Sequence, residues 1–307
     1  MAGTSDRVVV VRLQGGVGNQ LFEYAAGRFI AERDQARLFV ERPREAGINL
    51  FDLLPATECV EVPVEVLRRF RASGANDSKV QRLLSAVMRE MPWQQAKYGI
   101  VREGFGGDLR VPSDVRSRNT LLIGWFIHVD WFGSTVGSVS KMVLERLMSH
   151  PAYSLAQDAT VVSFRRGDFV RWGLALGSDY YENAVAALKD RHGPCFVVGD
   201  DDMFCDFACD WLRQRGLSAQ RRPDLPGSTG LTDLALIAGA RQVIMSNSTF
   251  CWWARTAGDA AGPEGRTIIG PEPWNKFRLR EGDTRNKVGA WSDSWIRVPA
   301  SFTSGPE

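Results

Sequence analysis

The segment of this sequence with the clearest chemical potential is a pair of adjacent arginines followed by an aspartate. Arg165, Arg166 and Asp168 come directly after Thr160–Phe164, an apolar run that predicts a strand and contains Ser163. A guanidinium is costly to bury without an anion, and its fork of N–H groups fits a phosphate. We therefore expect Arg165 to bind phosphate, and Asp168 either to orient an arginine or to accept a proton. A surface ion pair that ends the strand is the alternative.

A second candidate site is a row of four small polar residues between a predicted strand and a predicted helix: Ser246, Asn247, Ser248 and Thr249. Their hydroxyl, amide and backbone N–H groups could converge on one spot, which suits a phosphate at a helix start. An ordinary N-cap needs only one such side chain. The row therefore favours an anion site over a simple cap, and the aromatic residues that follow it would anchor the helix in the core.

A glycine-rich turn stands between Val8–Leu13, which predicts a strand, and a helix that begins near Asn19. The residues that would approach a ligand are Gly15, Gly16, Gly18 and Asn19. Glycines let the backbone come close to a ligand, and a helix start presents unpaired N–H groups to an anion. A tight strand-to-helix turn is the alternative, because the spacing is not GxGxxG and no Walker lysine follows.

An acidic cluster follows the apolar run Phe196–Gly199. Asp200 and Asp202 could form a DxD motif that holds a sugar diphosphate through Mn²⁺. Alternatively, one carboxylate could accept hydrogen bonds from the N1–H and N2 amine of guanine. The acidic residues could also cap the next helix. The sequence therefore allows three roles for this cluster: a metal site, a guanine contact or a helix cap.

Strands and helices alternate in both halves of the chain, which predicts parallel, doubly wound sheets with ligands at the carboxyl ends of the strands. The first half shows a strand–helix–strand start, weaker helical patterns at 64–70 and 78–91, and a helix at 139–148. The second half shows strands at 160–164, 196–199, 243–246 and 267–269, with helices at 181–191, 206–215, 232–240 and 249–257. Because Ser149-His150-Pro151 breaks the helical pattern, we expect domains at 1–152 and 153–307, with a C-terminal tail able to pack back on the first domain.

Composition excludes several classes of protein. The chain has 307 residues, 44% hydrophobic, and a formal charge of only +2, so no global field draws it to nucleic acid. Its five cysteines form no CxxC pair, which indicates neither a disulfide framework nor a zinc site and fits a cytoplasmic protein. No run is long enough to span a membrane, and a lipid-linked acceptor would require peripheral contact. No GxSxG, HExxH or kinase motif is present.

Taken in order, the four segments resemble the motifs of the glycosyltransferase family 11 α-1,2-fucosyltransferases. That family opens with a GGLGNQMFQYA-like segment, and residues 15–25 read GGVGNQLFEYA. Its HxRRxD motif is similar to residues 163–168, its SDD to residues 199–201, and its (S/N)NSTFSWW to residues 246–253. The resemblance covers about residues 8 to 275, and its first and last motifs are individually specific.

The resemblance implies two Rossmann-like domains that face each other across a cleft, the GT-B-like arrangement, and inverting transfer of fucose from GDP-fucose to a hydroxyl of a glycan or small molecule. No metal and no cofactor besides the donor substrate is implied. Arg165 would neutralise the β-phosphate, with Asp168 as the catalytic base. Asp200 would bind guanine, while Ser163 and Arg166 would line the nucleotide site. Ser246–Thr249 would hold phosphate or ribose, and the glycine turn would approach the diphosphate from the first domain.

Three departures from the family pattern keep other activities open. Ser163 replaces the family histidine, Gly199 replaces a serine and Glu23 replaces a glutamine. A tailoring transferase that uses a different nucleotide-sugar is one alternative, and a non-catalytic nucleotide- or glycan-binding module is another. The third is a metal-dependent GT-A transferase in which Asp200 and Asp202 bind the metal.

Overall fold

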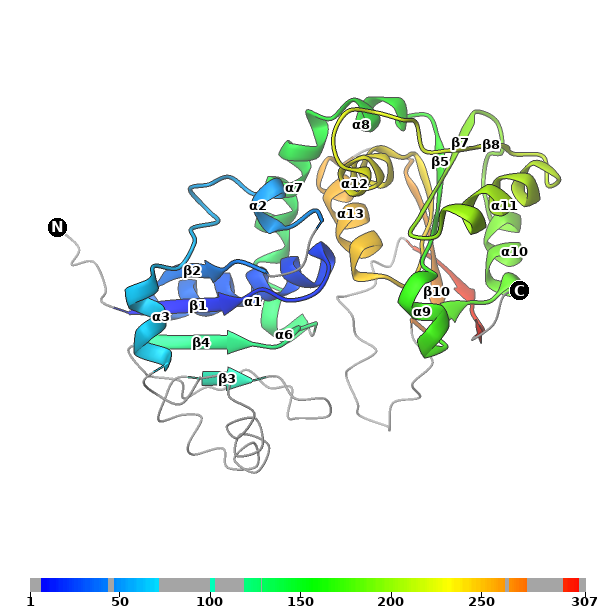
Figure 1. Cartoon of the computed structure of the whole chain (residues 1–307). Helices are drawn as coiled ribbons and strands as arrows, with labels where there is room; N and C mark the ends of the chain where they lie inside the picture. Colours follow the sequence, from blue (N-terminus) through cyan, green and yellow to red (C-terminus); the bar gives the residue numbers. More distant parts are fainter. Residues whose placement is uncertain are drawn as a thin grey trace. The chain divides into compact units, whose positions relative to one another are not determined.

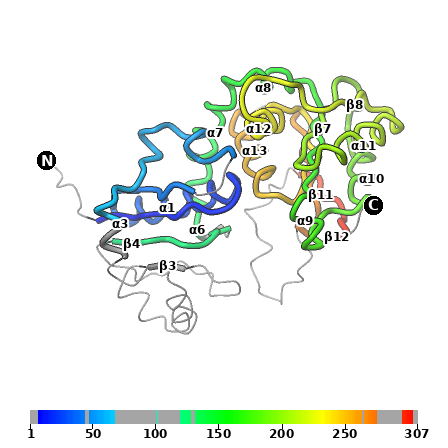
Figure 2. The backbone as a smooth tube through the Cα atoms, in the orientation of Figure 1, coloured from blue at the N-terminus to red at the C-terminus, as the bar shows by residue number. Residues whose placement is uncertain are grey.

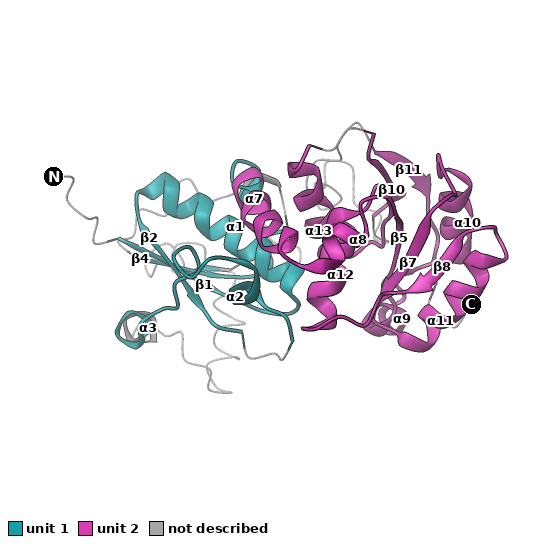
Figure 3. Ribbon diagram, turned by 90° about the horizontal axis from the view of Figure 1, so that it is seen from above, with its two compact units in different colours: residues 1–136 teal, residues 137–307 magenta. Residues whose placement is uncertain are grey.

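The computed structural model divides the chain into two compact units, Met1–Val136 and Gly137–Glu307, which are coloured separately in Figure 3. It describes residues 7–43, 47–71, 100–102, 119–127, 129–262, 265–274 and 295–303. The helix predicted at 78–91 lies outside these ranges. Among the described helices, none is both long enough and apolar enough to cross a lipid bilayer.

The first unit contains a parallel four-stranded sheet in the order β2-β1-β4-β3 (Figure 1). Its strands are β1 (Val8–Arg12), β2 (Arg37–Glu41), β3 (Ile100–Arg102) and β4 (Asn119–Ile123). Its helices are α1 (Val17–Asp34), α2 (Leu50–Leu53), α3 (Val64–Arg71) and α6 (Val129–Phe132). Helix α1 packs closely on β1, since a Cβ added at Gly27 would lie only 2.1 Å from a methyl carbon of Val11. The predicted strand–helix–strand start is confirmed.

The second unit contains a parallel six-stranded sheet in the order β11-β10-β9-β5-β7-β8. Its strands are β5 (Thr160–Phe164), β7 (Pro194–Gly199), β8 (Ser218–Arg221), β9 (Gln242–Ile244), β10 (Thr267–Glu272) and β11 (Ile296–Pro299). A separate antiparallel pair joins β6 (Ala175–Leu176) to β12 (Phe302–Thr303). The described part of the C-terminal tail pairs within the second unit, through β11 and β12.

Seven helices are described along the second unit's part of the chain, and Figure 2 follows the backbone that links them. They are α7 (Val136–Met148), α8 (Pro151–Leu155), α9 (Gly167–Trp172), α10 (Ser178–Ala186), α11 (Asp202–Arg213), α12 (Thr229–Gly239) and α13 (Thr249–Ala260). Helices α10 and α11 share one hydrophobic cluster with Val162, Val197 and Ile244 of the sheet. Helix α12 packs on α8 and α13.

The division between the units falls after Val136, earlier than the boundary predicted at residue 152. The break at Ser149-His150-Pro151 is the start of another helix: His150 is the N-cap of α8, and its Nδ1 accepts a hydrogen bond from the backbone N–H of Ala152 at 3.3 Å. Because α8 packs on α12, the residues on both sides of this break belong to the second unit.

Candidate functional site

The sheet of the second unit has one point where the chain reverses its direction across the sheet. From β5 the chain runs to β7 and β8 at one edge, then returns to β9 and continues to β10 and β11 at the other. The carboxyl ends of β5 and β9 are therefore neighbours at a topological switch point, where open α/β sheets bind ligands. Two predicted segments follow these two strands, residues 165–168 after β5 and residues 246–249 after β9.

Arg165 lies between two carboxylates at the carboxyl end of β5. Its Nη2 donates to Oδ1 of Asp168 at 2.7 Å, and its Nη1 lies 2.8 Å from Oδ2 of Asp200. The guanidinium also lies near the ring of Phe169, with 5.2 Å between Cζ and the ring centroid. A guanidinium has five N–H groups, and 36% of this side chain is exposed, so N–H groups remain to bind a ligand. Two aspartates thus orient an arginine that stays accessible at the switch point.

Asp200 is engaged by two donors from the segment that follows β5. Its Oδ1 accepts a hydrogen bond from the backbone N–H of Arg166 at 2.8 Å, while its Oδ2 pairs with Arg165. Gly167 leaves room for this contact, because a Cβ at that position would lie 2.6 Å from Oδ2 of Asp200. Asp200 therefore holds the turn that carries Arg165, and its predicted contact with guanine stays a prediction.

Arg166 is buried, in contrast to Arg165. It is 8% exposed, and its guanidinium lies over the ring of Phe204, with 3.9 Å between Cζ and the centroid. Its Nε lies 4.0 Å from Oδ2 of Asp201 and has no hydrogen-bond partner among the described residues. A buried cation with such weak pairing is costly unless another group compensates it. The nucleotide contact predicted for Arg166 stays a prediction.

Three buried serine hydroxyls connect the ends of β5 and β9. The Oγ of Ser163 lies 3.1 Å from that of Ser246, which lies 3.0 Å from the Oγ of Ser248. Ser248 also caps α13, since its Oγ accepts the backbone N–H of Cys251 at 3.1 Å. Serine at position 163 therefore joins the two strand ends at the place where the resemblance predicts a histidine ring.

Asn247 presents a buried amide at the same edge. Its Nδ2 donates to the backbone carbonyl of Leu174 at 2.9 Å, and its Oδ1 has no hydrogen-bond partner within the described ranges. The residue is only 5% exposed. A buried acceptor without a donor is unfavourable, so this oxygen is a candidate contact for a ligand N–H or hydroxyl. Thr249 is the first residue of α13 and completes the predicted row.

Asp233, in α12, is a candidate to which the sequence motifs assign no role. It is 8% exposed, and burial raises the pKa of its carboxyl to about 7. Its Oδ2 lies 3.5 Å from Nη1 of Arg222, whereas its Oδ1 has no hydrogen-bond partner among the described residues. The signal was available in principle, because a carboxyl inside the apolar run 231–238 is costly without a function.

The geometry of Asp200 and Asp202 bears on the metal-dependent alternative. Asp202 pairs with Arg221 and, at 3.3 Å, with Nη2 of Arg222, and the hydrogen bond from Arg221 lowers the pKa of its carboxyl. Asp200 instead pairs with Arg165. The two carboxylates of the possible DxD motif are thus held by different arginines. Within the described ranges, no group of three or more His, Cys, Asp or Glu residues could hold a metal ion.

The glycine turn of the first unit is shaped by backbone conformation and one amide side chain. Gly15 has a φ of 65°, and Gly16 is the N-cap of α1 without a side-chain hydrogen bond. The Nε2 of Gln20 donates to the carbonyl of Gly15 at 2.7 Å, while its Oε1 accepts the N–H of Leu50 at 2.9 Å. This turn presents an uncapped helix start, as the sequence predicts. The contacts expected from Gly15, Gly16, Gly18 and Asn19 to a diphosphate stay predictions.

A family model described as glycosyl transferase family 11 matches residues 139–280, which contain the β5, β7 and β9 segments. The resemblance to family 11 that the sequence motifs predict is thereby confirmed. A relative from Escherichia coli, named alpha-1,2-colitosyltransferase, is 21% identical over 310 residues, with 95% of this chain and 99% of the relative covered.

Two solved structures show what fold the chain is similar to. The crystal structure of POFUT1 in complex with GDP-fucose superposes with a TM-score of 0.50 and 15% identity, and the comparison covers 90% of this chain and 99% of that one. A structure of POFUT1 in complex with GDP gives a TM-score of 0.50 at 13% identity, covering 87% and 99%. The predicted α/β class of the GT-B-like type is therefore confirmed.

The family 11 match and the colitosyltransferase relative together confirm the enzyme class predicted from the four ordered motifs, a glycosyltransferase. Three of those motifs fall inside the matched region, and their side chains meet at one edge of one sheet. The non-catalytic alternative is therefore set aside.

Proposed function

We propose that this family 11 enzyme transfers fucose, or a closely related deoxyhexose, from a GDP-sugar to a hydroxyl of a glycan or small-molecule acceptor. The observation that carries the proposal is Arg165, an exposed guanidinium fixed by two carboxylates at the switch point of the sheet. The names of the relatives support the donor class: one is a colitosyltransferase, and the POFUT1 structure contains GDP-fucose.

The chemistry follows from the charge that develops when the bond between the sugar C1 and the phosphate oxygen breaks. Negative charge accumulates on the leaving GDP, so donors already aimed at the diphosphate lower the barrier. Arg165 supplies such a donor because Asp168 and Asp200 hold it without covering it. The hydroxyl chain that ends at Ser248, together with the start of α13, supplies further donors to the same anion.

A single displacement with inversion needs one base near the acceptor hydroxyl. Asp168 is the candidate base, and its Oδ1 accepts a hydrogen bond from Arg165. This contact alone favours a role in orienting Arg165 over a role in accepting a proton. For Asp168 to serve as the base, the acceptor hydroxyl must reach the carboxylate in the ternary complex.

The base of the nucleotide requires acceptors for an N–H and an amine. Asp200 uses one oxygen on Arg165 and the other on the backbone of Arg166, whereas Oδ1 of Asp233 lacks a partner among the described residues. Asp233 is therefore the better candidate for the guanine edge. The buried Oδ1 of Asn247 is a second acceptor available to the nucleotide.

The transfer is proposed to proceed without a metal. The support is local: Asp202 is paired with Arg221 and Arg222, and Asp200 with Arg165, so both carboxylates already have cationic partners. Transfer measured after exhaustive EDTA treatment should equal that of the untreated enzyme. Activity that returns only when Mn²⁺ is added would instead favour the metal-dependent alternative.

The test of the proposal is transfer from, or hydrolysis of, GDP-fucose by Arg165→Ala. Loss of one aligned donor to a developing charge costs about 10²- to 10³-fold in rate. Arg171→Ala is the matched control. Arg171 is exposed and lies in the same segment, in α9, whereas Asp168 and Asp200 contact Arg165. Equal activity of Arg165→Ala and Arg171→Ala, with both proteins folded, would contradict the proposal.

The donor itself is tested by thermal shift with GDP, UDP, ADP and dTDP. A nucleotide present at 100 times its Kd stabilises the protein by about 2.7 kcal/mol. We expect GDP to give the largest shift. Since Ser163 occupies the position of the family histidine, a larger shift with another nucleotide would identify the tailoring alternative with a different donor.

A further inference from the structure

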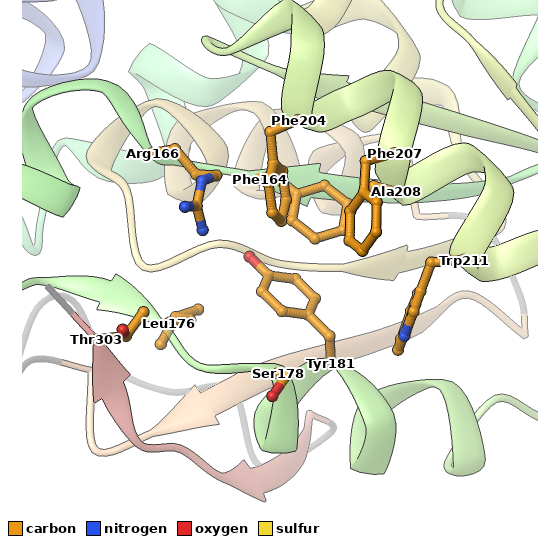
Figure 4. Close-up of a pocket in the computed structure, with 10 residues that line it drawn as sticks. All are labelled: Phe164, Arg166, Leu176, Ser178, Tyr181, Phe204, Phe207, Ala208, Trp211 and Thr303. Atoms are coloured by element: carbon orange, nitrogen blue, oxygen red, sulfur yellow. The ribbon is translucent and has the colours of Figure 1, made fainter. Parts of the chain in front are cut away.

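A cavity beside Arg166 is not used by the proposed transfer. It encloses about 100 Å³ and is lined by residues of α10 and α11 on the side of the sheet that carries their shared hydrophobic cluster (Figure 4). Five of its lining residues are aromatic: Phe164, Tyr181, Phe204, Phe207 and Trp211. A cavity of this volume has room for several water molecules. One six-membered ring takes up a comparable space.

One end of the cavity is polar. The guanidinium of Arg166 and the hydroxyl of Tyr181 point toward each other there (Figure 4). Arg166 is 8% exposed, and its Nε has no hydrogen-bond partner among the described residues. Tyr181 donates to the carbonyl of Ser163 at 3.2 Å, which leaves its oxygen able to accept. A ligand that supplies an oxygen at this end would compensate a buried cation.

The other end of the cavity reaches solvent along α11. Phe207, which lines the cavity, is 56% exposed, and Met203, one helical turn earlier but outside the lining, is 85% exposed. Exposed aromatic surface next to a concavity is typical of ligand sites that combine apolar walls with a few polar groups.

We infer that this cavity is a carbohydrate subsite that holds one pyranose ring. The C–H face of a pyranose is apolar and stacks on aromatic rings, while its hydroxyl oxygens accept hydrogen bonds from a guanidinium. Phe207 and Trp211 in the cavity wall fit the apolar face of the ring, and Arg166 at the polar end fits its hydroxyl oxygens. An aliphatic ligand would leave the Nε of Arg166 without a partner, so a sugar fits better than a purely apolar molecule.

The cavity and the switch point share one segment of chain. Phe164 and Arg166 line the cavity, and Arg165 between them belongs to the proposed donor site. A pyranose in the cavity would therefore lie next to the donor-binding turn of the same unit, as a second sugar of the acceptor would. The inference rests on the glycosyltransferase assignment, and it does not depend on which nucleotide the enzyme uses.

The experiment measures sugar binding to the full chain by saturation-transfer NMR, without donor and then with saturating GDP. The probes are the methyl glycosides of D-glucose, D-galactose and L-fucose, with cyclohexylmethanol as an apolar probe of similar size. We expect at least one glycoside to bind, GDP to leave that binding in place, and the glycoside to bind more tightly than cyclohexylmethanol.

Matched variants on α11 locate the site. Phe207→Ala should weaken glycoside binding about 5-fold, because one stacking face is lost, and Phe207→Tyr should restore it. Met203→Ala should change the affinity less than twofold, since its side chain does not line the cavity. Absence of glycoside binding, binding unaffected by Phe207→Ala, or tighter binding of cyclohexylmethanol would overturn the inference. Failure of GDP to bind would count against the proposed donor and would leave this measurement intact.

Discussion

Both units contain a turn that leads from a strand into a helix, and the two turns differ in the residues that form them. In the first unit β1 leads through Gly15 and Gly16 into α1, and the turn contains no charged side chain. In the second unit β5 leads through Arg165 and Arg166 into α9, and aspartates surround the turn. One turn offers backbone N–H groups, and the other offers guanidinium groups.

The comparison shows what each kind of site requires from the rest of its unit. The glycine turn needs conformational freedom and two side chains of α1. The amide of Gln20 bridges Gly15 and Leu50, and the carboxylate of Glu23 accepts the backbone N–H of Gln14 at 2.9 Å. The arginine turn needs counter-charges from elsewhere in the chain, such as Asp200 after β7. A charged site should therefore be sensitive to remote changes, whereas the backbone site should respond mainly to changes in the turn itself.

Among changes that remove no charged group, the largest expected effect comes from weakening the support of the charged turn. A methyl group at position 167 would lie 2.6 Å from Oδ2 of Asp200, so Gly167→Ala should push that carboxylate away from Arg165. Displacement of a positioning group by about 1 Å can cost about 100-fold in rate. We expect kcat for GDP-fucose to fall by that order while the melting temperature changes little.

The control for this variant is Gly137→Ala, because a Cβ at position 137 would meet no atom within 4 Å. Gly137 lies in α7, away from both turns in sequence. Wild-type kcat in Gly167→Ala would show that the clamp between Asp200 and Arg165 does not matter for transfer.

The next effect concerns the buried carboxyl of Asp233 and depends on pH. Burial raises its pKa from the ordinary 3.8 to about 7, so the folded protein holds a proton that the unfolded chain releases. The stability that this proton confers is fully present below about pH 4 and is lost as the pH rises through about 7. Asn cannot ionise. Between about pH 5 and 8.5, wild type should therefore lose about 2.5 kcal/mol of unfolding free energy relative to Asp233→Asn.

Urea denaturation of both proteins across that pH range measures the difference. The comparison must be made without nucleotide, because a ligand that binds Asp233 would add its own linkage. A constant gap between wild type and Asp233→Asn at every pH would mean that the carboxyl titrates normally in the folded protein.

The fold was largely predictable from sequence because the buried strands are short, apolar and bounded by turns. The run 160–164 and its neighbours were recognisable for this reason. Strand β8 was missed because it reads SAQR and only Ala219 is buried, as suits a strand at the edge of the sheet. The boundary near residue 152 was misplaced because Pro151 at the first position of a helix gives the same signal as a linker.

The candidate site was predictable where its residues are contiguous. Arg165 with Asp168, and the row that begins at Ser246, each form a local motif beside one strand. The pairing of Asp200 with Arg165 and of Asp233 with Arg222 joins residues that are distant in the chain, so no spacing pattern could reveal it. The sequence therefore indicated which groups carry charge but not which carboxylate each arginine would meet.

The smallest effects sharpen the comparison from the side of the glycine turn. Gly15 has a φ of 65°, and a Cβ there would lie 3.1 Å from Nδ2 of Asn19, so Gly15→Ala should destabilise the first unit by about 1 kcal/mol. Gly16 has a φ of −69° and open space around its Cβ position, so Gly16→Ala should cost less, about 0.5 kcal/mol, because alanine is a poorer N-cap residue than glycine. Gly15→Ala thus tests the backbone conformation of the turn, and Gly16→Ala tests a methyl group on its open surface.

If the N–H groups at the start of α1 meet the diphosphate, the methyl group of Gly16→Ala would stand in the ligand's path. KM for the donor should then rise a few-fold while kcat stays at the wild-type value and the melting temperature falls only slightly, because the change affects ground-state and transition-state binding equally. Steady-state kinetics with varied GDP-fucose would measure this split. An unchanged KM in Gly16→Ala would assign the turn a structural role only, and all of the phosphate contacts would then fall to the charged turn of the second unit.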